Sequence, residues 1–77
     1  MKKEEFYQIL KQELEVTTGN IDQETILRSI PGWDSMSTLV IITIADNHFG
    51  VKLNSQQLSS LKTVGDIIHL IGDQHFQ

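Results

Sequence analysis

The stretch Pro31-Gly32-Trp33-Asp34-Ser35-Met36 decides how this chain is interpreted, because a structure breaker is followed directly by a helix start. Proline disfavours helical backbone at the residue before it, and glycine allows a sharp turn, so the preceding segment ends here. Asp34 is a good N-cap, which places Ser35 in the first turn of a helix. Gly50 is a typical C-terminal stop. The sequence therefore predicts a helix from Ser35 to Phe49.

This predicted helix has two opposite sides that both carry apolar residues. At about 100° per residue, one side holds Thr38, Ile41, Ile42, Ala45 and Phe49, and the other holds Met36, Val40, Thr43 and Asn47. Only one of the two sides can face the core of a domain this small. We expect the second side, which is largely apolar, to be a docking surface for partner proteins. The alternative is that Val40 packs under the preceding loop.

The segment before this helix predicts one further helix and a long packed loop. Apolar residues at three- and four-residue spacings predict an amphipathic helix from Lys3 to Val16, with a break near Thr17-Thr18-Gly19. Roughly 15 residues then lead to Asp34, which is long for a connection in a compact domain. We expect this loop to pack on the helices, with a helical turn after Asp22. The apolar residues that indicate such packing are Ile21, Ile26, Leu27 and Ile30.

The segment after Gly50 predicts a short helix and a last helix. Val51-Lys52-Leu53 is typical of an extended link, and Asn54 or Ser55 can cap a brief helix carrying Leu58 and Leu61. Thr63-Val64-Gly65-Asp66 has the spacing of a capping box, with Asp in place of Glu. The apolar face of the last helix comprises Ile67, Ile68, Leu70 and Ile71. We expect the chain to fray from Gln74 to Gln77.

These elements predict an all-α fold: a small four-helix bundle, in one domain over residues 1–77, with a long first loop and a short third helix. The chain has 77 residues, 39% of them apolar and 21% charged, as expected for one globular domain. A core of this size leaves little room for a deep, water-excluding cleft, which argues against an enzyme. Because cysteine is absent, any sulfur chemistry must come with a cofactor.

Charge and segment composition limit the partners and the location. The formal net charge of −4 disfavours binding to nucleic acid or to an anionic membrane and favours partners with basic surfaces. The start Met1-Lys2-Lys3-Glu4-Glu5 runs into an amphipathic segment without the apolar stretch of a signal peptide. No window approaches the roughly 20 apolar residues of a membrane span. We therefore expect a cytoplasmic protein, and a monomer.

Ser35 is the residue to which the sequence points for chemistry. The first turn of a helix has unpaired N–H groups and a partial positive charge, so it tolerates a phosphate esterified there. The plainer interpretation of Asp34-Ser35-Met36 is a simple helix cap. Trp33 could cover the site as a lid or anchor the loop to the helix; we favour the anchor, because large aromatic residues contribute heavily to small cores.

We expect no catalytic triad of a histidine with Asp34 and Ser35; His69 or His75 could approach Ser35 only if the last helix folded beside it. His48 lies 13 residues beyond Ser35 on the same predicted helix, which is about 20 Å at 1.5 Å per residue and far outside hydrogen-bond reach. The spacing of His48, His69 and His75 offers no i, i+4 pair that would bind a metal from one helix face. We expect no catalytic residue and no metal site, and three histidines at the surface or its boundary.

From about Glu4 to Gly72, the sequence resembles the acyl carrier protein family. The resemblance rests on an ordered set of features: the long loop, Asp34-Ser35-Met36, Phe49-Gly50-Val51, Leu58, Leu61 and Thr63-Val64-Gly65-Asp66-Ile67. It implies that a separate, magnesium-dependent phosphopantetheinyl transferase attaches 4'-phosphopantetheine from coenzyme A to Ser35, with Asp34 in the recognition and transfer environment. It also implies a carrier rather than an enzyme, holding acyl groups as thioesters on the arm's thiol for acyl-loading and acyl-processing enzymes that bind transiently.

The sequence departs from this family in its charges. Carriers of fatty acid synthesis are usually rich in glutamate after the serine, whereas the helix from Ser35 to Phe49 has one carboxylate, Asp46, and Val40 stands where glutamate is frequent. Electrostatic steering by this helix should be weak. We therefore favour a polyketide-like or other specialised lipid pathway over housekeeping fatty acid synthesis. Pro31-Gly32-Trp33-Asp34 lacks the Gly-Gly frequent in peptide-synthetase carriers, which makes an aminoacyl cargo less expected. The alternative is an unmodified, carrier-like adaptor that binds partners through the apolar side.

Overall fold

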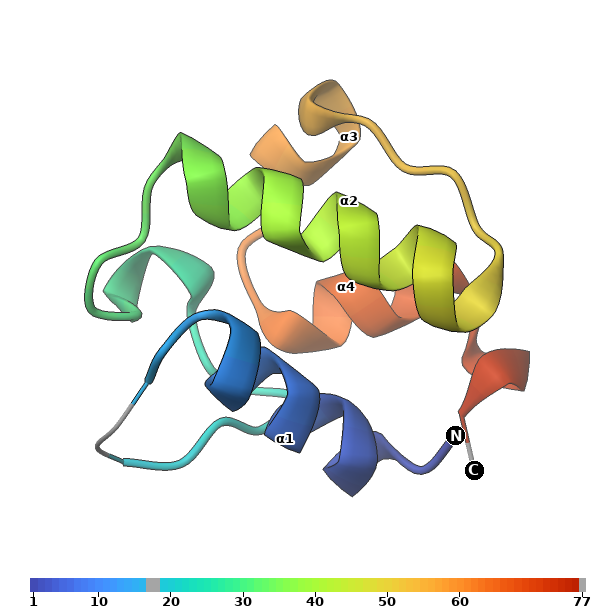
Figure 1. Ribbon diagram of the computed structural model, residues 1–77, viewed down its shortest axis with the longest axis horizontal. Coiled ribbons are helices and arrows are strands. Elements are labelled where there is room, and N and C mark those ends of the chain that lie inside the picture. Colours follow the sequence, from blue (N-terminus) through green and yellow to red (C-terminus); the bar gives the residue numbers. More distant parts are fainter. Residues whose placement is uncertain (17–18, 77) are drawn as a thin grey trace.

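The structure is a computed structural model that describes residues 1–16 and 19–76. Over these residues the chain forms four α-helices, two 3-10 helices and one isolated β-bridge (Figure 1). The helices are α1 (Lys3–Glu13), η1 (Leu27–Ser29), α2 (Ser35–Phe49), α3 (Ser55–Ser59), α4 (Val64–Ile71) and η2 (Asp73–His75). The all-α fold, the long first loop and the short third helix are confirmed. The break predicted at Thr17-Thr18 lies outside the described residues.

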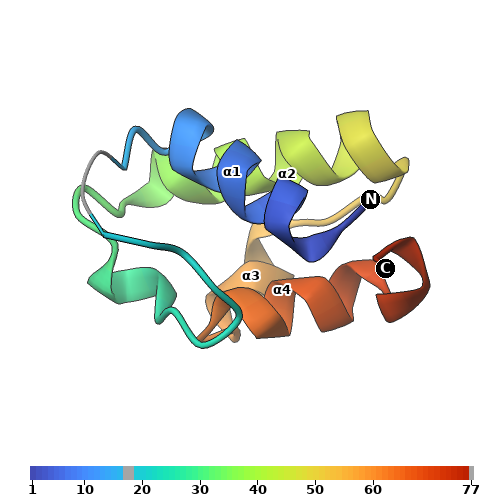
Figure 2. The same ribbon diagram turned by 90° about the horizontal axis from the view of Figure 1, so that it is seen from below.

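The helices are arranged in two layers, with α1 and α2 on one side and α3 and α4 on the other (Figure 2). The segment that holds η1 lies at the end of the molecule where α2 begins, and the two ends of the chain meet at the opposite end (Figure 1). There the amino nitrogen of Met1 donates to the carbonyl oxygen of His75 at 3.1 Å. No helix within the described residues has the length and apolarity needed to cross a membrane.

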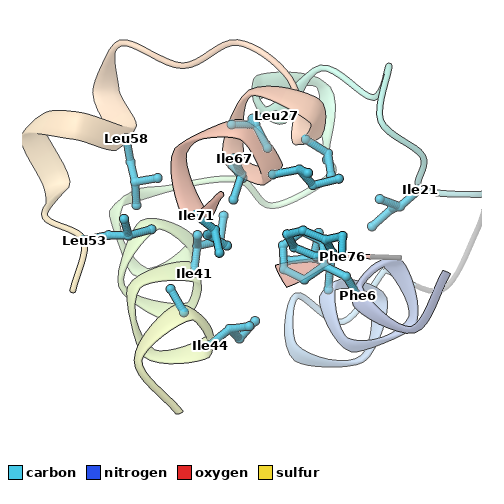
Figure 3. Close-up of a cluster of buried hydrophobic side chains, with 14 of the residues drawn as sticks. Phe6, Ile21, Leu27, Ile41, Ile44, Leu53, Leu58, Ile67, Ile71 and Phe76 are labelled. Atoms are coloured by element: carbon cyan, nitrogen blue, oxygen red, sulfur yellow. The ribbon is translucent and has the colours of Figure 1, made fainter. Parts of the chain in front are cut away.

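The core forms between the two layers (Figure 3). Its buried apolar side chains are Phe6, Leu10, Ile21, Leu27, Ile30, Ile41, Ile44, Ala45, Leu53, Leu58, Val64, Ile67, Ile68, Ile71 and Phe76. Ile41 and Ala45 confirm the predicted inner side of α2. Ser37 and Ile44 are also buried, whereas Thr38, Ile42 and Phe49 of the predicted inner side are half-buried, so the buried side of α2 is turned from the predicted one.

The predicted end of the first helix at Val16 is wrong, because α1 ends at Glu13. Glu15 adopts a left-handed backbone with φ 56°. Its N–H donates to the Gln12 carbonyl at 3.3 Å, and the Val16 N–H donates to the Lys11 carbonyl at 2.9 Å. This is a Schellman motif, in which a residue with positive φ closes the helix and satisfies its last carbonyls. Glycine usually takes that position, so the sequence offered no signal for it.

The long loop packs on the helices, as predicted, with one exception. Ile21, Leu27 and Ile30 are buried, whereas Ile26 is 56% exposed. The prediction that Ile26 packs inward is therefore wrong. Its extended backbone pairs with Thr63 in an antiparallel bridge at the surface, and the apolar side chain buried here is that of Leu27, the first residue of η1.

Backbone hydrogen bonds fasten the loop to the first turn of α4. Asp22 begins a turn in which the Thr25 N–H donates to the Asp22 carbonyl at 3.1 Å, close to the helical turn predicted there. The Val64 N–H donates to the Thr25 carbonyl at 3.0 Å, and the Gly65 N–H donates to the Gln23 carbonyl at 2.8 Å. A Cβ at position 65 would lie 2.9 Å from that Gln23 oxygen, so the close approach requires glycine.

The predicted caps of the last two helices are confirmed. Asn54 caps α3, and Leu61 lies beyond the end of that helix instead of within it, which corrects the prediction. Thr63 and Asp66 form the reciprocal capping box of α4. The Asp66 carboxylate accepts from the Lys62 and Thr63 N–H groups, and these hydrogen bonds hold the pKa of Asp66 below its ordinary value.

The predicted fraying at the C-terminal end is wrong for the described residues. After α4, Asp73–His75 form η2 and return the chain to the core. Phe76 is 8% exposed and packs against two aromatic rings from other elements. Its ring centroid lies 5.3 Å from that of Phe6 and 5.0 Å from that of Phe49. Gln77 lies outside the described residues.

Candidate functional site

Ser35 is the first residue of α2 and is exposed. The turn before it begins at Ile30, whose carbonyl accepts from the Trp33 N–H at 3.0 Å. Gly32 has φ 78°, a backbone conformation that favours glycine, so the turn depends on this residue. The turn ends at Asp34, which has extended backbone and leads directly into the helix. This local geometry presents the Ser35 hydroxyl at one end of the molecule.

A reciprocal cap holds this helix start. Oδ1 of Asp34 accepts from the Ser37 N–H at 3.1 Å, and Oγ of Ser37 accepts from the Asp34 N–H at 3.2 Å. Ser37 is only 8% exposed. The Ser35 hydroxyl takes no part in the cap, so it stays available to solvent. Sequence reasoning missed Ser37, although a short polar residue three positions after an N-cap is the signal for this arrangement.

A groove of about 230 Å³ runs beside Ser35 between η1, the start of α2 and α3. Its lining residues are Leu27, Arg28, Trp33, Asp34, Ser35, Thr38, Leu58, Ser59 and Leu61. A wider hollow of about 540 Å³ shares Ser35, Thr38 and Ser59 and continues between α2 and α3. Trp33 is half-buried and packs on the core, which confirms the anchor interpretation, and it also forms part of the groove wall.

A third hollow, of about 290 Å³, follows the outer side of α2 at the end of α1. The four predicted partner-binding residues all line it: Met36, Val40, Thr43 and Asn47. Met36 is 63% exposed and Leu39 is 51% exposed. Val40 is half-buried and packs against the core, so it is less exposed than Met36 and Leu39. Leu39 also lines the hollow and was missed, although its three-residue spacing from Met36 places the two on neighbouring positions of one face.

Asp46 and the three histidines do not line the hollows beside Ser35. Asp46, the one carboxylate within α2, pairs with Lys52 at 2.8 Å. His48 is exposed, and Nδ1 of the exposed His69 lies 3.1 Å from Oδ2 of Asp73. His75 is half-buried, with its ring 5.6 Å from that of Phe49. These positions confirm the expectation for all three histidines. No cluster of metal-ligating side chains occurs in the part of the chain that the structure describes.

Comparison with known proteins decides the family. The profile of a family described as a phosphopantetheine attachment site matches residues 4–71. The chain belongs to the acyl carrier protein family. Acyl carrier proteins of Saccharopolyspora erythraea, Myxococcus xanthus and Thermotoga maritima are among its relatives. No solved structure gives a significant match.

The relatives match most of the carrier's length. The Saccharopolyspora protein is 27% identical over 70 residues, which cover 91% of this chain and 74% of the relative. The Myxococcus protein is 30% identical over 64 residues, covering 83% of this chain and 81% of the relative. The Thermotoga protein is 30% identical over 63 residues, covering 82% and 78%. All three are acyl carrier proteins.

Family membership makes 4'-phosphopantetheine the cofactor of this carrier. Proteins of this kind are carriers and not catalysts, and they work with partner enzymes such as transferases and acyl-processing enzymes. The residues at the start of α2 fit the group. An exposed hydroxyl stands in the first helical turn, and the groove beside it combines apolar walls, Leu58 and Leu61, with the hydroxyls of Thr38 and Ser59.

Proposed function

We propose that Ser35 carries the 4'-phosphopantetheine arm and that the chain serves a polyketide-like or other specialised lipid pathway as its acyl carrier. The observation that carries this proposal is the exposed Ser35 hydroxyl in the first turn of α2, at the mouth of a groove that can take an extended chain. The unpaired N–H groups of a helix start favour a phosphate at this position.

The neighbouring residues orient the arm and leave its chemistry to the cofactor. Asp34 and Ser37 hold the helix start, so the backbone that carries Ser35 is held in the first turn of α2. Thr38 and Ser59 offer hydroxyls to the amides of the arm, beside the apolar walls of the groove. When bound, the group supplies the thiol on which an acyl group is carried as a thioester, a sulfur that this cysteine-free chain lacks.

We assign partner docking to the outer side of α2, defined by Met36, Leu39, Val40, Thr43 and Asn47. Asp46 is neutralised by Lys52, so this face offers no unpaired carboxylate from within α2. Association with the phosphopantetheinyl transferase and with acyl-loading and acyl-processing enzymes then depends on apolar contact more than on charge. This is the reason for favouring a specialised pathway. A single domain over residues 1–77, a monomeric state and a cytoplasmic location complete the proposal.

Intact-protein mass spectrometry tests the attachment residue. The chain is incubated with coenzyme A, magnesium and a broad-specificity phosphopantetheinyl transferase. We expect wild type to gain the mass of one phosphopantetheine and Ser35→Ala to gain none. Ser55→Ala is the matched control, because Ser55 is likewise the first residue of a helix that follows a side-chain cap, Asn54. It should be modified like wild type.

The other outcomes separate the proposal from its alternative. A gain on Ser35→Ala would move the attachment to another residue. No gain on folded wild type, with several transferases, would favour the unmodified adaptor that binds partners through the outer side of α2. Circular dichroism shows whether each variant is folded. We expect both serine variants to be folded, because a change from Ser to Ala in the first helical turn costs little stability.

The transferase reaction also tests the docking face. The exposed large apolar residues of the described chain are Ile26, Met36 and Leu39, of which the last two lie on α2. We expect Met36→Asn or Leu39→Asn to raise the KM for the carrier by roughly fivefold or more, the effect of losing a significant interface contact. Ile26→Asn, on the loop, should change it less than about twofold. An equal effect of all three variants would contradict docking through α2.

A further inference from the structure

Arg28 lies in the groove beside Ser35, and the sequence pattern assigns it no role. It belongs to η1, and its guanidinium Nη2 lies 3.5 Å from the carbonyl oxygen of Ser59, at the end of α3. The side chain thus crosses the groove from one wall to the other. Because the hydrogen bond is at the limit of a useful length, it uses little of the donor capacity of this group.

The charges that line this groove are Arg28 and Asp34. The Asp34 carboxylate accepts from the Ser37 N–H in the cap. The ion pairs within the described residues join Lys52 to Asp46 and His69 to Asp73, so the Arg28 guanidinium forms none there. The groove therefore contains a guanidinium whose several N–H donors bind no carboxylate of the described chain.

A phosphodiester on Ser35 would bring a second negative charge into the groove beside Asp34. Like charges that share a site repel each other, and a guanidinium can offset this by binding phosphate oxygens through two parallel N–H donors. We propose that Arg28 binds the phosphodiester of the arm and positions the arm in the groove between η1 and α3. This proposal rests on Ser35 as the attachment residue.

Arg28 is a positioning residue in this scheme. It contacts neither the arm's thiol nor the cargo, and it shifts the balance between an arm held in the groove and an arm free in solvent. Since Arg28 is exposed, we expect this balance to change by only about two- to fivefold, the effect of a surface ion pair. Such a weak hold suits a carrier whose partner enzymes must withdraw the arm.

Phosphorus NMR of the modified protein tests the proposal without any activity assay. Wild type, Arg28→Gln, Arg28→Lys and Lys62→Gln are each modified, and one arm is verified by mass. Lys62 is the matched control: it is exposed, and its carbonyl accepts from the Leu27 N–H, so it lies next to η1 without lining the groove. The resonance of the arm in urea-unfolded protein provides the reference for a free phosphodiester.

We expect the folded wild-type resonance to differ from this reference and to approach it in Arg28→Gln. The resonance of Lys62→Gln should match that of wild type. The resonance of Arg28→Lys should lie between those of wild type and Arg28→Gln, because lysine keeps the positive charge but lacks the two parallel N–H donors of the guanidinium. Raising sodium chloride from about 0.05 M to about 0.5 M should reduce the difference in wild type and leave Arg28→Gln unchanged, since salt screens an exposed pair. The backbone amides of Thr38 and Ser59 should follow the same order.

An unchanged phosphorus resonance in folded, singly modified Arg28→Gln would overturn the role of Arg28 and leave Ser35 as the attachment residue. A response to Arg28→Gln that occurs only when the arm carries a carboxyacyl group, and not a simple acyl group, would overturn it too. In that case the ligand of Arg28 would be the carboxylate of the cargo. A wild type that gains no arm would overturn both the proposed function and this inference, and the mass spectrum identifies that case.

Discussion

Asp34 has a structural role in the cap of α2 and an expected role in the transfer of phosphopantetheine. The family resemblance places this residue in the environment of phosphopantetheine transfer, and the structure places its carboxylate in the cap of α2. One oxygen, Oδ1, accepts from the Ser37 N–H at 3.1 Å and also lies 3.4 Å from the Ser37 hydroxyl. We therefore expect a substitution at Asp34 to act both on the folding of α2 and on the proposed modification of Ser35.

Two substitutions at Asp34 separate these effects. Asp34→Ala removes the cap acceptor and should lower the free energy of unfolding by about 1 kcal/mol. Asp34→Asn keeps an acceptor oxygen and should stay within a few tenths of a kcal/mol of wild type. Urea unfolding measures both values. An Asn variant as unstable as the Ala variant would show that the negative charge, and not the hydrogen bond, stabilises the helix start.

The rate at which the two Asp34 variants gain phosphopantetheine tests the second role of this residue. If the Asp34 carboxylate takes part in transfer, Asp34→Asn should be fully folded and yet modified more slowly than wild type by the same transferase. Mass spectra taken over time measure this rate. A rate equal to that of wild type would limit Asp34 to the cap.

At the scale of the element, the end of α1 shows a strained residue at a helix terminus. Glu15 has φ 56°, a left-handed backbone conformation that is disfavoured for residues other than glycine and asparagine. The Schellman hydrogen bonds of Glu15 and Val16 compensate for this strain. The early end of α1 sets where the long loop begins its course toward η1 and Ser35.

Glu15→Gly should therefore raise the free energy of unfolding by about 0.5 to 1 kcal/mol, because glycine adopts positive φ without steric cost. Glu13→Gly is the matched control, since Glu13 is the last helical residue of α1, and it should lower stability by about 0.5 to 1 kcal/mol. Urea unfolding of both variants measures the difference. A destabilised Glu15→Gly would mean that the Glu15 side chain makes a contribution larger than the strain.

At the scale of the whole molecule, an aromatic cluster of Phe6, Phe49 and Phe76 packs segments near the two ends of the chain against the end of α2. Phe6 from α1 lies 6.0 Å from Phe49 of α2 in an edge-to-face arrangement, and Phe76 packs on both. This cluster lies at the end of the molecule where α2 ends, away from Ser35. It joins three segments that no short-range signal connects.

Phe76→Ala should lower the free energy of unfolding by about 3 kcal/mol, a large part of the stability of a small domain. Phe76→Leu should cost clearly less, because it keeps apolar volume in the cluster. Thermal unfolding followed by circular dichroism measures the loss. Gln74→Ala, at an exposed position of η2, is the control and should stay within about 0.5 kcal/mol of wild type. A Phe76→Ala variant as stable as this control would contradict a structural role for the cluster.

The amino-acid sequence by itself determined where three of the helices begin. Asp34 and Thr63 were predicted as caps, and Asn54 or Ser55 as the cap of the third helix. The structure confirms Asp34, Thr63 and, of the two candidates, Asn54, because a cap is a hydrogen bond between residues two or three positions apart. The position of Ser35 in the first turn of α2 follows from the same local rule. The inner side of α2 was also predicted in part, since helical periodicity identifies which residues share a face.

Only the tertiary structure decided what the other residues do. The exposed Ile26, the buried Phe76 and the place of Arg28 across from Ser59 all depend on contacts between segments distant in sequence. The closure of α1 by Glu15 is local, but it uses a residue other than glycine at positive φ, which no sequence pattern indicated. A local pattern reports which residues are neighbours along one helix, but burial and groove walls are set by the elements that pack around it. The outer side of α2 stays open because none of the helices formed by residues 1–16 and 19–76 covers it.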